Sequence, residues 1–279
     1  METVDNFTND SAMMIAYERS LESQRPDALF QDPYAAALAG SKGEQLSENF
    51  GNGAKMFGFP LWPQFHKQWT AVRTRFIDDR VEEHAPNLTQ LVNLGAGMDT
   101  RPNRMPAYAA FARSMEVDME VVNTSKAKIF SKFLSSPASH CPVENVDLDF
   151  LDKEKSLASE LGQRGFDATV PSLFLSEGLI MYLGAEGKVK LLGDVSAVAA
   201  VGSVLVLQFM DATGSDAAKE NPAVLNSALS QEEARKELGE RGWGDFQFFA
   251  FGDDALNFGR FQGDKPSLSF SFCVCKKLS

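Results

Sequence analysis

The sequence predicts an α/β fold in a single domain of 279 residues, with a mostly parallel sheet covered by helices on both faces. From about residue 87 onwards, short apolar runs alternate with longer helical stretches, which is typical of strands joined by crossover helices. One of these runs ends in a small-residue turn, Gly95-Ala96-Gly97. Acidic residues recur where the following strands are expected to end, as at a ligand site on the carboxyl edge of an open sheet.

Residues 1–86 are expected to form an N-terminal helical cap that contributes to the substrate region. The stretch 8–40 follows a helical spacing, and Asp32-Pro33 opens a second helix because proline suits the first helical turn. Residues 40–58 contain glycine, serine and asparagine and are expected to form a loop. A longer helix is expected from Gln64 to Glu83.

The remaining residues, 87–279, are expected to form the core that binds a cofactor. Seven strands are expected, at Gln90–Leu94, Ala112–Val117, Val143–Leu148, Ser172–Ser176, Ser203–Met210, Gln247–Phe251 and Leu268–Cys275. Helices are expected at Glu120–Leu134, Lys153–Arg164, Ala185–Val201 and Ser230–Arg241. The last two strands have no long helix between them, so we expect an antiparallel hairpin at the sheet edge. Seven strands that end in this way match the class I methyltransferase (Rossmann-like) fold.

Composition excludes several functional classes. A net charge of −11 argues against binding to nucleic acid or to an anionic membrane surface. The first residues lack a basic segment followed by an apolar one, and no apolar run is long enough to span a membrane. Three cysteines and three histidines make neither a disulfide framework nor a metal site. We therefore expect a cytoplasmic protein without a metal; the sequence does not predict its oligomeric state.

The glycine turn indicates which nucleotide cofactor the site takes. A dinucleotide-binding turn has the pattern G-x-G-x-x-G, but Thr100 stands at the third glycine position. Pro102 and Pro106 leave barely one helical turn after the loop, so little helix dipole is available to a pyrophosphate. A cofactor without phosphate fits better, and S-adenosylmethionine is the commonest. A nicotinamide-dependent oxidoreductase remains an alternative.

Acidic residues at the ends of three successive strands are candidates for binding this cofactor. Asp118 is placed to accept both ribose hydroxyls, with Glu116 as its rival on the same strand and face. Asp147 can accept from the adenine amino group while Leu148 packs against the ring. Glu177 is placed near the charged end of the cofactor. Each carboxylate could instead cap a helix or lie in a solvated turn.

Arg73, on the helix before the first strand, offers a bidentate fork for the methionyl carboxylate; the alternative is a salt bridge on the helix surface. The acceptor pocket is expected to form between the N-terminal helices and residues 57–69. Its candidate lining residues are Tyr17, Arg19, Phe57, Trp62, Phe65, Trp69 and Tyr182. Such an aromatic cluster could equally be core packing of a helical cap.

Together these pieces resemble the leucine carboxyl methyltransferase family, which includes many bacterial small-molecule O-methyltransferases. The motifs that carry the resemblance are Pro26–Pro33, Arg73–Asp78, Asn93–Arg101, Ser176–Leu183 and Phe272–Lys277. Asn103 departs from the pattern, because an aromatic residue is usual before Arg104. The Ser176–Leu179 segment is of the small-molecule kind, which argues against a protein C-terminus as substrate.

The resemblance implies a class I fold that uses S-adenosylmethionine. By motif match, Arg73 and the loop Gly95, Ala96 and Gly97 would hold the methionyl end, Asp118 the ribose, Asp147 with Leu148 the adenine, and Glu177 the edge of the site. It implies O-methylation of a small molecule bearing a carboxylate or an acidic hydroxyl. Alternatives are a methyltransferase for protein C-terminal carboxylates and a catalytically silent module that binds the cofactor.

The expected mechanism relies on positioning the two reactants. A carboxylate acceptor is already ionised at neutral pH and needs no general base, whereas a hydroxyl acceptor needs one. His66 is the only histidine placed in a plausible lid, within residues 57–69, and Tyr182 is the other candidate catalytic side chain.

Overall fold

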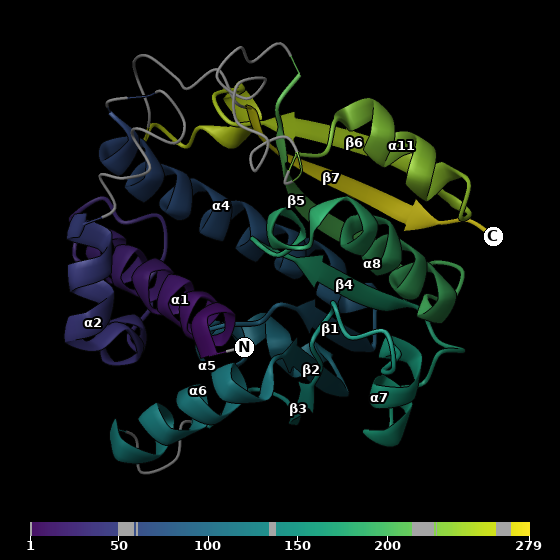
Figure 1. Cartoon of the computed structure of the whole chain (residues 1–279), viewed down its shortest axis with the longest axis horizontal. Coiled ribbons are helices and arrows are strands. Elements are labelled where there is room, and N and C mark those ends of the chain that lie inside the picture. Colours follow the sequence, from purple (N-terminus) through teal and green to yellow (C-terminus); the bar gives the residue numbers. More distant parts are fainter. Residues whose placement is uncertain are drawn as a thin grey trace.

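The structure is a computed structural model that describes residues 2–49, 59, 61–133, 138–213, 226, 228–260 and 269–279. Seven strands form one sheet in the order β3-β2-β1-β4-β5-β7-β6 (Figure 1). Their bounds are β1 Gln90–Leu94, β2 Arg113–Asp118, β3 Val143–Asp147, β4 Ser172–Ser176, β5 Val204–Asp211, β6 Trp243–Ala250 and β7 Ser269–Lys277. Strands β1 to β5 pair in parallel, and β7 runs antiparallel between β5 and β6. The predicted mostly parallel sheet with an antiparallel edge is therefore confirmed.

Helices cover both faces of the sheet. Their bounds are α1 Glu2–Ser23, α2 Ala35–Asn49, α4 Trp62–His84, α5 Arg101–Arg104, α6 Glu120–Phe133, α7 Leu157–Gln163, α8 Gly184–Val198 and α11 Gln231–Gly239. Short 3₁₀ turns lie at Ala85–Asn87, Pro106–Ala110, Ile180–Tyr182 and Asp254–Leu256. Every residue of β1 and β4 is buried, as expected for parallel strands with both faces covered.

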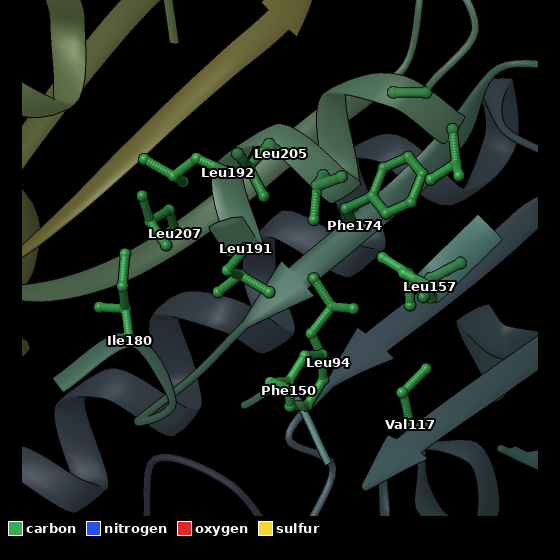
Figure 2. Close-up of a cluster of buried hydrophobic side chains, with 14 of the residues drawn as sticks. Leu94, Val117, Phe150, Leu157, Phe174, Ile180, Leu191, Leu192, Leu205 and Leu207 are labelled. Carbon is green, nitrogen blue, oxygen red and sulfur yellow. The ribbon is translucent and has the colours of Figure 1, made fainter. Parts of the chain in front are cut away.

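Two apolar clusters fill the space between the sheet and its helices. One packs α4 against the sheet face that carries Leu91, Leu175 and Phe272. The other packs α7, α8 and α11 against the opposite face, and its side chains from β1, β4 and β5 interdigitate with α8 in Figure 2. Burial of these two faces leaves the carboxyl ends of the parallel strands as the edge from which polar side chains project.

Helices α1 and α2 pack against each other beside α6 (Figure 1). Asp32 begins the second helix as predicted, because its Oδ1 accepts hydrogen bonds from Tyr34 N and Ala35 N at 3.2 and 3.1 Å. Met98, just beyond the glycine turn, is buried among Ala16, Leu38 and Ala39 of these helices. The N-terminal helices therefore pack directly on the end of β1.

The expected loop at 40–58 is wrong in its first part. Helix α2 continues to Asn49 across a kink at Gly40, whose φ of 55° is open to glycine. Gly43 is a packing residue rather than a loop signal, because a Cβ there would collide with the backbone of Met13 in α1. Residues 50–58 lie outside the described residues.

Other boundaries also differ from those expected. Strand β6 starts at Trp243 rather than Gln247. Its register shifts between Gly244 and Gln247, and Asp245 takes a φ of 52°, so the alternating pattern of a strand is broken in its first residues. Helix α7 starts at Leu157 because the Oγ of Ser156 accepts from Ser159 N and caps it. These local irregularities interrupt the periodicity on which sequence prediction depends.

Candidate cofactor site at the carboxyl edge of the sheet

The glycine turn after β1 is fixed by main-chain hydrogen bonds to β2. Gly95 N and Ala96 N both donate to Val117 O, at 2.8 and 3.2 Å. Gly95 and Gly97 have φ values of 69° and 51°, in the left-handed region that favours glycine. A Cβ at Gly95 would lie 3.1 Å from Leu179, so the loop is also closely covered from the β4 side.

Asp118 ends β2 and holds the other side of this turn. Its Oδ2 accepts from Gly97 N at 2.7 Å, and its Oδ1 accepts from Met119 N at 2.8 Å. Burial raises the pKa of Asp118, and the two backbone hydrogen bonds only partly oppose that shift. Each carboxylate oxygen retains a second lone pair, so the predicted role as acceptor for ribose hydroxyls fits the geometry.

Glu116 has a different partner. Both of its carboxylate oxygens accept from Lys126 Nζ, at 2.8 and 2.7 Å, and both side chains are buried. Burial raises the pKa of Glu116 although Lys126 opposes that shift. Because this carboxylate is neutralised inside the protein, the geometry favours Asp118 over Glu116 as the ribose ligand.

Asp147 and Leu148 lie beside Asp118 at the end of β3. Asp147 is the register partner of Asp118, and its Oδ1 accepts from Asn123 Nδ2 at 2.8 Å. Leu148 N donates to Asp118 O at 2.9 Å, and the Leu148 side chain is buried. The structure thus brings the predicted adenine and ribose ligands to adjacent strand ends.

Glu177 follows β4 and sits between two arginines. Arg73 Nε lies 2.9 Å from its Oε1, and Arg101 Nη1 donates to its Oε2 at 2.9 Å. Burial raises the pKa of Glu177, but Arg101 and Arg73 outweigh burial and hold the pKa below its usual range. Arg73 therefore pairs with Glu177 rather than with surface acids, and its part in binding the methionyl carboxylate stays a prediction.

Arg101 is the site residue that sequence reasoning missed. Its side chain is only 3% exposed and lies between three carboxylates: Nε donates to Asp78 at 2.7 Å, and Nη1 donates to Asp99 and Glu177. The nearby Asp99 holds the pKa of Arg101 above its usual range despite burial. The acid and the arginine of Asp99-Thr100-Arg101 are visible in the sequence. The sequence does not show that the short helix α5 directs the Arg101 side chain into the protein interior.

Helix α1 covers the glycine turn. Arg19 Nη2 donates to Met98 O at 2.5 Å, and Arg19 Nε donates to Asp32 at 2.9 Å. A Cβ at Gly97 would lie 3.2 Å from the Cβ of Ala12. Arg19 therefore fixes the cap to the cofactor loop in this structure, while its predicted part in lining the acceptor pocket stays a prediction.

The family model for leucine carboxyl methyltransferase matches residues 12–196, a span that runs from α1 through β4 to α8. The chain belongs to the leucine carboxyl methyltransferase family. The resemblance read from the sequence is confirmed, and with it the methyltransferase class at the level of the family.

Two relatives support this assignment, and both are named as candidate S-adenosyl-L-methionine-dependent methyltransferases. A Parafrankia sp. (strain EAN1pec) protein is 34% identical over 205 residues, which cover 73% of this chain and 63%, less than two thirds, of that protein. A Mycolicibacterium vanbaalenii protein is 30% identical over 252 residues, which cover 84% of this chain and 82% of that protein.

Solved structures share the fold at low sequence identity. A DUF574 family protein from Streptomyces avermitilis matches with a TM-score of 0.63 and 16% identity, over 96% of this chain and 97% of that one. A protein from Thermobifida fusca described as a candidate methyltransferase matches with a TM-score of 0.58 and 17% identity, over 86% and 90% of the two chains. The class I methyltransferase fold is thereby confirmed.

The residues at the carboxyl edge fit the methyl donor that the names of the two relatives specify. Gly95 and Gly97 carry no side chain in this turn, and a Cβ there would crowd Leu179 and Ala12, respectively. The Asp118 carboxylate, which accepts from Gly97 N, has further lone pairs for hydroxyl donors. Glu177, whose pKa is lowered, suits the positive charges of a sulfonium and an ammonium. Across β3, β2, β1 and β4 the residues predicted to bind adenine, ribose and the methionyl end follow one another in that order.

His66, the candidate catalytic histidine, is held by a buried carboxylate. His66 Nδ1 lies 2.9 Å from an oxygen of Glu18 on α1, which also accepts from Thr70 Oγ1 at 2.6 Å and Ser47 Oγ at 3.3 Å. Burial raises the pKa of Glu18, but His66 outweighs burial and the pKa is lowered. The Glu18 carboxylate on α1 therefore binds side chains of both α2 and α4.

The remaining predicted acceptor residues lie in varied surroundings. Trp62, Phe65 and Trp69 are buried in the aromatic cluster between α4 and β7, with ring centroids 5.3–5.7 Å from Phe270. These three contribute core packing, and a further role in acceptor binding stays a prediction. Phe57 lies outside the described residues.

The last two candidates lie nearer the surface. Tyr17 donates to Glu44 at 3.2 Å, and the half-exposed Tyr182 lies 3.2 Å from Ser11 Oγ, so α1 meets the turn after β4. The described residues contain no group of His, Cys, Asp and Glu side chains suited to a metal ion. Nor does the described part of the chain include a helix that is long and apolar enough to cross a membrane.

Proposed function

We propose that the protein transfers the methyl group of S-adenosylmethionine to an oxygen of a small carboxylic acid. Family membership supports the transfer chemistry, and the carboxyl edge of the sheet supplies ligands for the donor. When bound, the donor supplies an electrophilic methyl group whose bond to sulfur breaks as the new oxygen–carbon bond forms. The protein aligns the two reactants. Alignment of this kind lowers the activation free energy by about 7–11 kcal/mol at best.

The state of Glu177 is the observation that carries the carboxylate assignment. Glu177 is a titratable side chain beside the expected methionyl end, and although burial raises its pKa, Arg101 and Arg73 lower it. A carboxylate with a lowered pKa is a poor proton acceptor at neutral pH. An acceptor that arrives already ionised therefore suits the site better than one that must lose a proton.

A hydroxyl acceptor is the second candidate, and the Glu18–His66 pair favours it. A carboxylate bound to Nδ1 orients an imidazole and favours the tautomer whose Nε2 accepts protons. His66 would then be the general base. The net charge of −11 supports a small-molecule partner rather than nucleic acid or a membrane, and the three free, buried cysteines support a cytoplasmic location.

A methyl-transfer assay separates the two candidates. We expect ¹³C-methyl from S-adenosylmethionine to appear in products of a panel of small carboxylic acids, as esters that alkali cleaves to labelled methanol. We expect His66→Asn to change that rate by less than about threefold, since a base contributes roughly 10²–10⁴-fold only where a proton must be removed. Alkali-stable methyl ethers, formed from matched alcohols and lost in His66→Asn, would establish the hydroxyl route instead. Label on nitrogen or carbon would overturn both candidates.

A further inference from the structure

Gln208 lies in the protein interior beside the expected methionyl end of the cofactor. It is fully buried on β5, one residue beyond Leu207, which pairs with Ser176 at the end of β4. Gly178 N donates to Gln208 Oε1 at 2.7 Å. A Cβ at Gly178 would lie 3.6 Å from Arg73 Nη1 and 3.9 Å from Gln208 Oε1, so both side chains border the same turn.

The orientation of the Gln208 amide follows from this contact. A backbone N–H can only donate, so the atom that faces Gly178 is the oxygen, and the opposite atom is the nitrogen with its two N–H donors. Gln208 Nε2 has no hydrogen-bond partner among the described residues. A buried donor without an acceptor is costly, and in a native fold it calls for an explanation such as a ligand.

Sheet order places Gln208 beyond the cofactor. The candidate ligands for adenine, ribose and the methionyl group lie at the ends of β3, β2, β1 and β4 in that spatial order. A cofactor laid along them ends at Glu177, with its reactive end directed towards the next strand. That strand is β5, so Gln208, its first buried polar side chain, is the one nearest the expected position of the methyl acceptor.

Aromatic side chains adjoin Gln208 on the same face of the sheet. Phe272 is its register partner on β7, and the two side chains share a face because they are directly opposite. The Phe272 ring stacks on Phe76 at 4.5 Å and lies 5.8 Å from Trp69. Gln208 therefore lies on the sheet face that packs against the aromatic side chains of α4.

We propose that Gln208 binds the methyl acceptor by donating a hydrogen bond from Nε2 to one of its carboxylate oxygens. This inference rests on the proposed function and names a specificity-determining residue for it. The ligand class is a carboxylate joined to an apolar or aromatic body. A primary amide does not take up a proton at neutral pH, so Gln208 positions the acceptor and is not a base.

Nuclear magnetic resonance of the ¹⁵N-labelled full chain tests this role directly. The side-chain amide signals of Gln208 are assigned by their loss in Gln208→Glu, which keeps an oxygen for Gly178 N. S-adenosylhomocysteine is added to saturation, followed by sodium benzoate, acetate or phenylacetate, with benzyl alcohol as the neutral control. We expect at least one carboxylate, and not the alcohol, to shift the Gln208 signals saturably.

Several results would overturn the inference, and they are distinguishable. If S-adenosylhomocysteine alone shifts the Gln208 signals and the carboxylates cause no further shift, Gln208 is a ligand of the cofactor rather than of the acceptor. No response to any of the three carboxylates would remove its role in acceptor binding. No response of any signal in the protein to S-adenosylhomocysteine would instead overturn the proposed function.

Affinity measurements give a second, independent readout. Gln208→Glu replaces the donor with a repelling oxygen, so we expect calorimetry to show at least about tenfold weaker binding of the shifted carboxylate. Ser176→Ala is the matched control, because the Ser176 Oγ is also buried and has no hydrogen-bond partner in the described part of the chain, but it faces the opposite side of the sheet with Leu207. Equal losses in the two variants, or none in Gln208→Glu, would contradict the inference.

Discussion

Arg101→Met is expected to lower the free energy of unfolding by about 3–5 kcal/mol, the usual cost of removing one partner from a buried ion pair. Arg101 contacts Asp78, Asp99 and Glu177, and all these side chains are at most 14% exposed. Methionine fills a similar volume but leaves three carboxylates with less compensating charge. Desolvation without pairing is the physical reason for the large effect.

Thermal unfolding measures this loss. For a chain of this size we expect a fall in Tm of about 6–20 °C, at 2–4 °C for each kcal/mol. The matched control is Arg25→Met, because Arg25 is half exposed, its nearer acid Asp27 is exposed, and the buried Glu22 at 3.6 Å keeps Arg260 as its partner. Exposed pairs contribute roughly 0–1 kcal/mol, so the control should unfold close to the wild type. Similar Tm values for the two variants would show that the buried ion pairs of Arg101 do not stabilise the fold.

Asp118→Ala is expected to weaken binding of S-adenosylhomocysteine by about 1.5–3 kcal/mol, or roughly 10–150-fold, the range for hydrogen bonds to a charged group. The substitution removes the proposed ribose ligand and also frees Gly97 N from the carboxylate that holds the glycine turn. Both changes act in the same direction on the cofactor site. Isothermal calorimetry measures the affinity, and circular dichroism checks that the variant is folded.

Glu116→Gln is the control for this variant, since Glu116 is on the same strand and is paired with Lys126. A greater loss of affinity in Glu116→Gln than in Asp118→Ala would exchange the roles of the two acids. The wild type should also show a characteristic pH dependence. Burial raises the pKa of Asp118, so affinity should decrease as the pH falls through that raised pKa, because the protonated carboxyl loses its charge.

The sheet could be predicted from the sequence because its strands are short apolar runs separated by helices. The carboxyl ends of parallel strands meet at one edge, so Asp118, Asp147 and Glu177 were brought together by topology alone. The spacing of these acids along the chain was enough to predict that each lies at the end of a strand. No side-chain contact had to be known.

Other features depend on contacts that a local pattern does not contain. Gly43 reads as a loop residue until the close approach of α1 shows why a side chain is excluded. Arg101 reads as a surface charge until α5 turns it towards three acids. His66 was singled out as a cap residue, but its pairing with Glu18 joins positions 48 residues apart and is set by helix packing.

The central claim is that the carboxyl edge of the sheet binds S-adenosylmethionine, and calorimetry of the wild-type protein tests it most directly. S-adenosylmethionine, S-adenosylhomocysteine and NAD are titrated separately into the same preparation. We predict one site for each sulfur ligand with a Kd on the micromolar scale, about −8 kcal/mol, and no binding of NAD. Binding of NAD with no binding of either sulfur ligand would contradict the account.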